Sequence, residues 1–298
     1  MIKAVQGWAL LMTMGLTWGL SFSLARIAAV GGVHPLAITF YEAAIAGGIL
    51  LVVSVVRRRR VPVTRALVPL YLASGLLGMV LPGAIFFYAA AHVPAGILAI
   101  TLAIIPIVTF VGSALLRLEN FAFGRVAGVV LGALAIVLLV GPQQSLPDPA
   151  QLPWVLLGLV AAACYATFNV MLALWRPAGV TPGAATIGMF IAAALMMSVV
   201  LYATGAFVPF GWPWTEVEWA MLGLGVINAV SYSLYLRLIE TAGPVFTSQT
   251  ANLVTLFGVL WGIVIFGEQH SLWVWLSLIT MMAALSLVTP RRQAALPA

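Results

Sequence analysis

The strongest constraint in this sequence is a series of long apolar runs that follow one another from end to end of the chain. A run of about 20 apolar residues is long enough to cross the roughly 30 Å hydrocarbon core of a bilayer as a helix. Charged residues make up only 7% of the 298 residues and apolar types 63%, whereas a soluble domain carries about 25% charged residues. The sequence therefore predicts an all-α polytopic membrane protein and excludes a water-soluble fold of this size.

Ten transmembrane helices are predicted, and the connections between them are too short to hold a soluble domain. The predicted spans are residues 6–28, 35–56, 66–90, 94–116, 122–140, 153–174, 183–204, 217–238, 244–266 and 271–289.

Basic residues are distributed so unevenly between the predicted loops that they indicate an orientation. If the N-terminus is cytoplasmic, twelve of the thirteen Lys and Arg residues fall at cytoplasmic ends of the spans and only Arg26 at the other side, as the positive-inside rule requires. The twelve are Lys3, Arg57, Arg58, Arg59, Arg60, Arg65, Arg117, Arg125, Arg176, Arg237, Arg291 and Arg292. We therefore expect cytoplasmic N- and C-termini in a bacterial-type inner membrane. The net charge of +6 then reflects topology and predicts no nucleic-acid partner.

Residue types that would support a cofactor or enzymatic chemistry are scarce and dispersed. His34, His92 and His270 lie in predicted loops without metal-ligand spacing, and no two carboxylates are placed for acid–base catalysis. The glycine-rich stretches lack the lysine pattern of a phosphate-binding loop. Cys164 is the only cysteine, so no intramolecular disulfide can form. We expect no cofactor, no metal and no enzymatic activity, with an intramembrane enzyme as a remote alternative.

An internal repeat is visible at an offset of 147 residues, where "GVHP" at Gly32–Pro35 corresponds to "GVTP" at Gly179–Pro182. Further pairs match in the same order: Trp18 with Tyr165, Thr39 with Thr186, Gly78 with Gly225, Tyr88 with Tyr235 and Gly96 with Gly243. The chain is thus predicted to contain two five-helix units, residues 1–145 and 146–298. Because five is odd, the second unit enters the membrane from the opposite side, which gives the inverted repeat of many secondary transporters.

Three segments carry a resemblance to a known family. "TWGLSF" at Thr17–Phe22, "LLRLEN" around Glu119 and "VIFGEQ" around Glu268 are similar to segments of the EamA-type drug/metabolite transporter (DMT) superfamily. The resemblance implies ten helices as five plus five. Within the superfamily, the aromatic-rich interior most resembles the YddG-type amino-acid exporters. One departure is Glu42 in "TFYEAA", where the family often carries a basic residue.

Polar and aromatic residues inside the spans are the candidates for a substrate site, because a polar group facing lipid is costly. Asn228, Ser231, Tyr232 and Tyr235 lie at i, i+3, i+4 and i+7, so they share one helical face. The other candidates are Thr17, Trp18, Ser21, Phe22, Phe86, Tyr88, Thr101, Tyr165, Phe168, Asn169, Ser248, Gln249 and Asn252. Pro82 and Pro106 are expected to kink their helices. The alternative for each polar candidate is a hydrogen bond that holds two helices together.

The chemistry of this set predicts the class of substrate. Amides, hydroxyls and aromatic rings without a central fixed charge suit a neutral or zwitterionic organic solute, and an amino acid fits that description. We therefore expect a secondary transporter that exports such small molecules across the bilayer by alternating access. Export of other metabolites or amphiphilic drugs, or a pore, are the alternatives. The sequence sets no oligomeric state, and a monomer is compatible with it.

Two charged residues are candidates for gating or coupling. Glu42 lies inside the second span, roughly 10 Å from its outer end at 1.5 Å per residue. Arg26 lies near the outer end of the first span, so we expect the two to form an ion pair; proton coupling through Glu42 is the alternative. Glu119 and Glu268 lie in short turns, where we expect them to favour the positive N-terminal ends of the helices that follow.

Overall fold

The computed structural model describes residues 2–59, 61–119, 122–142, 145–175, 177, 179–247 and 249–288. Every regular element in these residues is helical. The elements are α1 (Ile2–Val30), α2 (Pro35–Val56), α3 (Val68–Gly75), the π-helix η1 (Leu76–Val80), α4 (Leu81–Ala90), α5 (Ala95–Leu102), α6 (Ile105–Leu115), α7 (Phe123–Val140), the 3-10 turn η2 (Pro149–Gln151), α8 (Leu152–Trp175), α9 (Pro182–Thr204), α10 (Glu216–Thr247), α11 (Thr250–Phe266) and α12 (Leu272–Val288).

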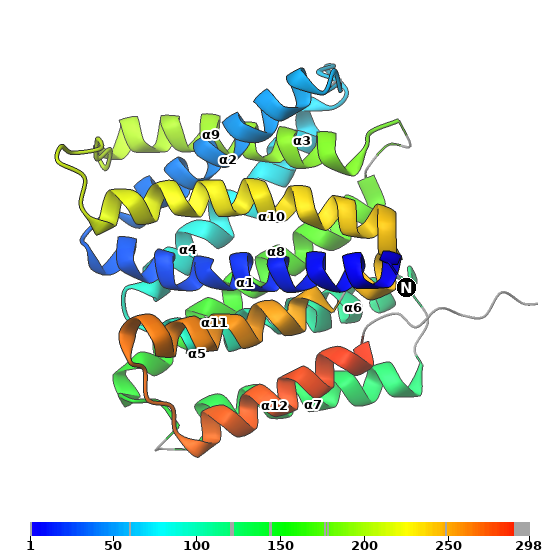
Figure 1. Ribbon diagram of the computed structural model, residues 1–298, viewed down its shortest axis with the longest axis vertical. Helices are drawn as coiled ribbons and strands as arrows, with labels where there is room; N and C mark the ends of the chain where they lie inside the picture. The colour runs from blue at the N-terminus through cyan, green and yellow to red at the C-terminus, as the bar shows by residue number, and fades with distance from the viewer. Residues whose placement is uncertain are drawn as a thin grey trace, which may run out of the picture.

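The helices are suited to a membrane by length and composition. Eight helical segments in the described residues are long and apolar enough to cross a bilayer, and α11 and α12 are shorter apolar helices. In Figure 1 they lie side by side with their axes roughly aligned. The predicted all-α fold is therefore confirmed for the described residues. That ten helices cross the membrane, that the two units form an inverted repeat and that both termini are cytoplasmic stay predictions.

The two similar loops start helices in the same way. Pro35 is the first residue of α2 and Pro182 the first of α9, where the missing N–H of proline costs nothing. His34 Nδ1 accepts a hydrogen bond from the N–H of Leu36 at 3.3 Å, and Thr181 Oγ1 accepts one from Ala184 at 3.2 Å. The loops differ at their glycines, because Gly32 has a φ of +86° and Gly179 is not in the left-handed region.

Two predicted spans are interrupted helices. The third consists of α3, η1 and α4, and the fourth of α5 and α6. Pro82 and Pro106 stand at the second residue of α4 and α6, directly after the irregular turns. The regular α-helix of each span is therefore interrupted next to the proline, where a kink is expected.

One predicted boundary is wrong. The eighth span was expected to end at residue 238 and the ninth to begin at 244, but α10 continues to Thr247 and α11 begins at Thr250. The sequence there contains Gly243 and Pro244, which usually end a helix in water. Membrane helices tolerate such residues because neighbouring helices satisfy the freed backbone groups.

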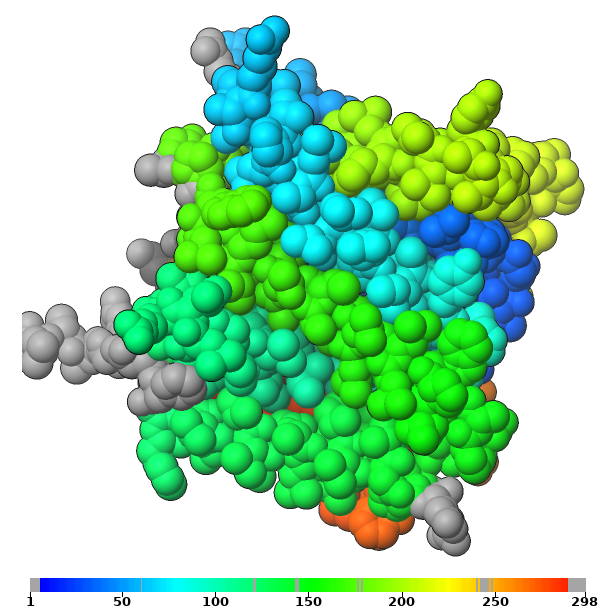
Figure 2. Space-filling view, turned by 180° about the vertical axis from the view of Figure 1, so that it is seen from behind, coloured from blue at the N-terminus to red at the C-terminus, as the bar shows by residue number. Residues whose placement is uncertain are grey.

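Helices from the two predicted units pack against each other. In Figure 1, α1 lies between α10 and α11, and it contacts both. On the opposite face, shown in Figure 2, α8 crosses the molecule, and it contacts α4, α5 and α6. The remaining large contacts are α2 with α9 and α10, α3 with α9, α5 with α11, and α7 with α12. The interior is therefore built at the junction of the two units.

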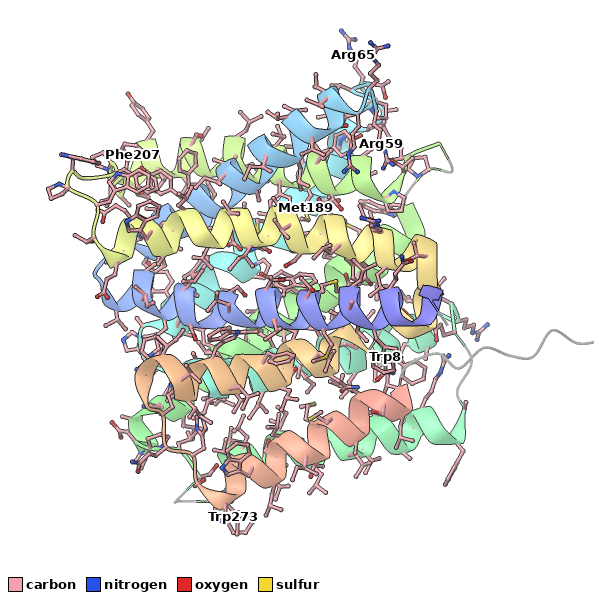
Figure 3. The ribbon with its side chains drawn as sticks, viewed as in Figure 1. Trp8, Arg59, Arg65, Met189, Phe207 and Trp273 are labelled. Atoms are coloured by element: carbon pink, nitrogen blue, oxygen red, sulfur yellow. The ribbon has the colours of Figure 1, made fainter. Side chains whose placement is uncertain are left out.

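The basic residues that the structure describes agree in part with the expected orientation. Arg59 and Arg65 lie toward the end of the molecule where the N-terminus lies (Figures 1 and 3). Arg26, near the C-terminal end of α1, belongs to the opposite end. Arg60, Arg176, Arg291 and Arg292 lie outside the described residues.

Candidate functional site

The polar face of α10 meets a carboxylate from α2. Asn228 Nδ2 donates a hydrogen bond to Glu42 Oε1 at 2.5 Å and another to the carbonyl of Leu224 at 3.1 Å. Three residues along α10, Ser231 Oγ lies 3.5 Å from Thr17 Oγ1 of α1. The face that the i, i+3, i+4, i+7 spacing predicted therefore does point toward other helices.

Aromatic side chains of neighbouring helices contact Tyr232, which lies one turn from Asn228 on α10. The ring of Trp18 lies 5.3 Å from that of Tyr232 and 6.4 Å from that of Tyr235, measured between centroids. Phe190 of α9 lies 5.4 Å from Tyr232, edge to face. Tyr165 of α8 interacts electrostatically with Glu42 and Tyr232. We name these residues the polar–aromatic cluster: Trp18, Glu42, Tyr165, Phe190, Asn228, Tyr232 and Tyr235.

The cluster draws on five helices, α1, α2, α8, α9 and α10, and so on both predicted units. Phe190 follows Met189, which Figure 3 labels near the middle of the bundle. Trp18, Glu42, Tyr165, Tyr232 and Tyr235 are each only partly buried. A group placed between them would meet one carboxylate, one amide, phenol hydroxyls and ring faces.

The expected ion pair between Arg26 and Glu42 is wrong. The Arg26 guanidinium donates to the carbonyl of Val93, and its Cζ lies 5.5 Å from the centroid of the Phe266 ring. Glu42 instead faces Asn228, and neither residue is in a salt bridge within the described part of the chain. The two charges start from neighbouring helices, but α1 and α2 make few contacts with each other and each packs mainly against other helices. The sequence also predicted a substrate site without a central fixed charge. That expectation is corrected too, because the carboxyl group of Glu42 belongs to the cluster.

Of the remaining sequence candidates, Thr17 and Ser231 lie beside the cluster and Phe168 packs against the same core as Phe190 and Tyr232, whereas the others lie apart from it. Phe22 and Phe86 contact each other at 5.9 Å between centroids, and Phe168 packs where a Cβ on Gly78 would be. Tyr88 is 39% exposed at the end of α4, 3.4 Å from His34. The polar ones bond to nearby groups: Ser21 to the carbonyl of Trp18, Thr101 to that of Ile97, Asn169 to Thr109, and Asn252 to Gln249 and Ser286. Ser248 lies outside the described residues.

The bonds of Asn169 to Thr109 and of Asn252 to Ser286 are of the kind that the alternative for the polar candidates predicts, whereas those of Ser21 and Thr101 stay within one helix. Asn169 joins α8 to α6, and Asn252 joins α11 to α12, so each holds two helices together. In the other direction, the sequence reasoning missed Phe190. It lies in the apolar run of α9, which has no polar stripe, so only the packing of α9 on α2 and against Tyr232 identifies it.

A second polar contact ties the "VIFGEQ" segment to the first unit. The Glu268 carboxylate accepts hydrogen bonds from the N–H groups of Ala95 at 2.7 Å and Gly96 at 3.1 Å, at the start of α5. His270 Nε2 lies 3.3 Å from the same carboxylate. Burial alone would raise the pKa of Glu268, but these hydrogen bonds and His270 lower it below its ordinary value.

The expected role of the two turn glutamates is thus partly corrected. Glu268 stabilises the positive end of α5 and not that of α12, the helix that follows it in sequence. Glu119 forms an ion pair with Arg125, in the first turn of α7. Nearness in sequence suggested α12 as the partner of Glu268. The partner is α5 instead, because α5 packs beside α11, the helix that Glu268 follows.

A pocket of about 420 Å³ lies at the surface, lined by Trp212, Pro213, Trp214 and Trp219. It belongs to the connection before α10 and the first turn of that helix, at the end of the molecule where Phe207 lies (Figure 3). Tryptophans at helix ends are typical of the membrane–water interface. We therefore place the candidate site at the polar–aromatic cluster.

Comparisons with known proteins bear on this arrangement. The sequence pattern of the family described as "EamA-like transporter family" matches residues 5–141 and 152–289. A protein of Archaeoglobus fulgidus named "Uncharacterized transporter" is 24% identical over 182 residues, which cover 61% of this chain and 64% of that protein. A solved structure described as "Crystal structure of protein" matches with a TM-score of 0.65 at 19% identity, over 94% of this chain and 96% of the other. That likeness supports the fold alone.

Proposed function

Because this chain belongs to the EamA-like transporter family, we propose that it is a secondary transporter that exports small organic solutes across a bacterial-type inner membrane. The solutes are neutral or zwitterionic, with amino acids, aromatic and other hydrophobic ones included, first among them. The observation that carries this proposal is the polar–aromatic cluster, where the Trp18 and Tyr232 rings lie beside the amide of Asn228. Rings offer apolar contact and attract an ammonium group, and the amide and hydroxyls offer hydrogen bonds.

Alternating access is supported by the way the helix contacts repeat. If the two units are exchanged, the packing of α1 on α10 corresponds to that of α8 on α4, and α1 on α11 to α8 on α5 and α6. In the same way, α2 on α10 corresponds to α9 on α3. A cluster at the junction of two such units can open first to one side and then to the other. We therefore infer the division into residues 1–145 and 146–298.

The transport proposal is tested by counterflow. Proteoliposomes preloaded with unlabelled phenylalanine should take up external labelled phenylalanine transiently above its equilibrium level, because the unlabelled substrate inside competes with the label for the site on a carrier that faces inward. Liposomes without protein are the control. Equilibration without an overshoot would indicate a pore instead, and an overshoot only with other metabolites or amphiphilic drugs would favour that alternative.

The orientation with both termini in the cytoplasm is part of the proposal and rests on the charge bias. Ala150 and Arg59 are exposed at opposite predicted sides of the membrane. In a Cys164→Ala background, Ala150→Cys should react with an impermeant maleimide added to intact spheroplasts. Arg59→Cys should react only after permeabilisation. The reverse labelling would contradict the orientation.

A further inference from the structure

The Glu42 carboxylate has no cationic partner in the described part of the protein. Its Oε1 accepts the hydrogen bond from Asn228, and no salt bridge there includes it. A carboxylate placed inside a bundle costs several kcal/mol unless a positive charge or a proton compensates it. The position therefore calls for a proton or for a cation that another molecule brings to it.

The surroundings of Glu42 suit an organic ammonium group. Tyr165 and Tyr232 interact with Glu42 electrostatically, and the ring of Tyr232 lies 5.3 Å from that of Trp18. Aromatic faces attract an ammonium group within about 6 Å of the ring centroid, and the attraction is stronger where water is displaced. Trp18, Glu42, Tyr165 and Tyr232 are each only partly buried.

Among the residues that the structure describes, no positive side chain lies near the cluster to receive the other end of a zwitterion. Arg26 is engaged with the Val93 carbonyl and the Phe266 ring. Arg237, two residues beyond Tyr235, is exposed on the face of α10 that it shares with Val230 and Ser233, away from Asn228 and Tyr232. The other described arginines lie at or beyond helix ends. Within the described residues, the cluster therefore holds a charged anchor for an ammonium group and only neutral hydrogen-bond donors for a carboxylate.

We infer that Glu42 and the rings of Trp18, Tyr165 and Tyr232 select solutes by their ammonium group. Primary amines and amino-acid amides are then bound at least as well as amino acids, and carboxylic acids without an amine are rejected. The inference rests on the proposed function, because it names the chemical class that the same site takes. It extends that proposal by making the carboxylate of the substrate dispensable.

Four probes of one shape test the inference: phenethylamine, phenylalaninamide, phenylalanine and 3-phenylpropionate. Each is offered as a competitor to labelled phenylalanine counterflow, and separately to the purified protein in a thermal-shift assay. We expect the amine and the amide to compete at concentrations equal to or below that of phenylalanine. The acid should compete at least about tenfold more weakly, since hydrogen bonds between charged groups are among the strong ones.

Variants assign the selection to Glu42. Glu42→Gln should remove the preference for the amine over the acid, whereas Glu42→Asp, which keeps the charge, should preserve it. Glu216→Gln, at the exposed start of α10, is a control that changes the net charge equally. Gel filtration establishes that each variant is folded. If Glu42→Gln does not fold, the comparison of Glu42→Asp with the wild type still tests the inference.

Two results would overturn the inference: equal competition by 3-phenylpropionate, or an amine preference that survives in Glu42→Gln. In both cases phenylalanine counterflow persists and the proposed function stands. Absence of counterflow for every probe would count against the proposed function. The thermal-shift assay then still decides the inference, because missing stabilisation by phenethylamine would overturn it as well.

Discussion

Tyr232→Ala is expected to lower phenylalanine counterflow by at least about tenfold, because aromatic anchors at the centre of a site carry most of its binding energy. Tyr232 contacts both Trp18 and Phe190, so its loss removes the ring that joins α1 and α9 across the cluster. The measurement is the initial rate of counterflow at equal amounts of reconstituted protein. Asn228→Ala should lower the rate as well, because the amide that contacts Glu42 is lost.

Tyr202→Ala is the matched control for this experiment. Tyr202 is 93% exposed near the end of α9, far from any contact with the cluster, so its removal should leave counterflow unchanged. If Tyr232→Ala and Asn228→Ala transport at the wild-type rate, the polar face of α10 serves only to hold helices together. The substrate would then bind elsewhere in the bundle.

Gly19→Ala is expected to destabilise the fold by about 1–3 kcal/mol, the usual cost of inserting a methyl group into a packed contact. A Cβ at Gly19 would lie 2.8 Å from the Cβ of Phe257 and 2.9 Å from the backbone N of Gly258, on α11. One turn earlier, a Cβ at Gly15 would lie 2.6 Å from the Cβ of Leu253. Small residues four apart let helix backbones approach closely in membranes. The methyl group would therefore push α1 away from α11.

The measurement is the melting temperature of the detergent-solubilised protein, followed by gel filtration after heating. Gly48→Ala in α2 is the control, because a Cβ there meets no atom within 4 Å. It should be neutral or stabilising by up to about 1 kcal/mol, since alanine favours helix. Equal melting temperatures for the two variants would contradict the close approach of α1 and α11.

The face of α10 shows how far a sequence can lead to a site. Helical periodicity placed Asn228, Ser231 and Tyr232 on one side of a helix, and the cost of burying polar groups in lipid directed that side inward. Both steps depend only on the spacing of residues along the chain and on the properties of the bilayer, so they require no knowledge of which helices pack together. The same reasoning could not separate these residues from Asn169 and Asn252, whose amides bond across other helix pairs.

Apart from the boundary between α10 and α11, the wrong predictions concern which side chains contact each other and not where the helices lie in the sequence. Arg26 and Glu42 were placed at similar depth, which the rise of a helix gives, but a salt bridge also requires both helices to turn the right faces to each other. Glu268 was assigned to the next helix in the chain, whereas it caps α5, whose first residue is 173 positions earlier. Phe190 carried no signal at all before α9 packed on α2.

The sequence by itself determined that this chain forms apolar helices and where most of them begin and end. Those properties follow from local propensity, from proline at helix starts and from transfer of apolar side chains out of water. Only the tertiary structure decided that Glu42 faces Asn228 and interacts with Tyr165 and Tyr232 rather than with Arg26. The rotation and crossing of helices in a bundle are set by packing between residues far apart in the chain, and those contacts are not encoded at any fixed spacing.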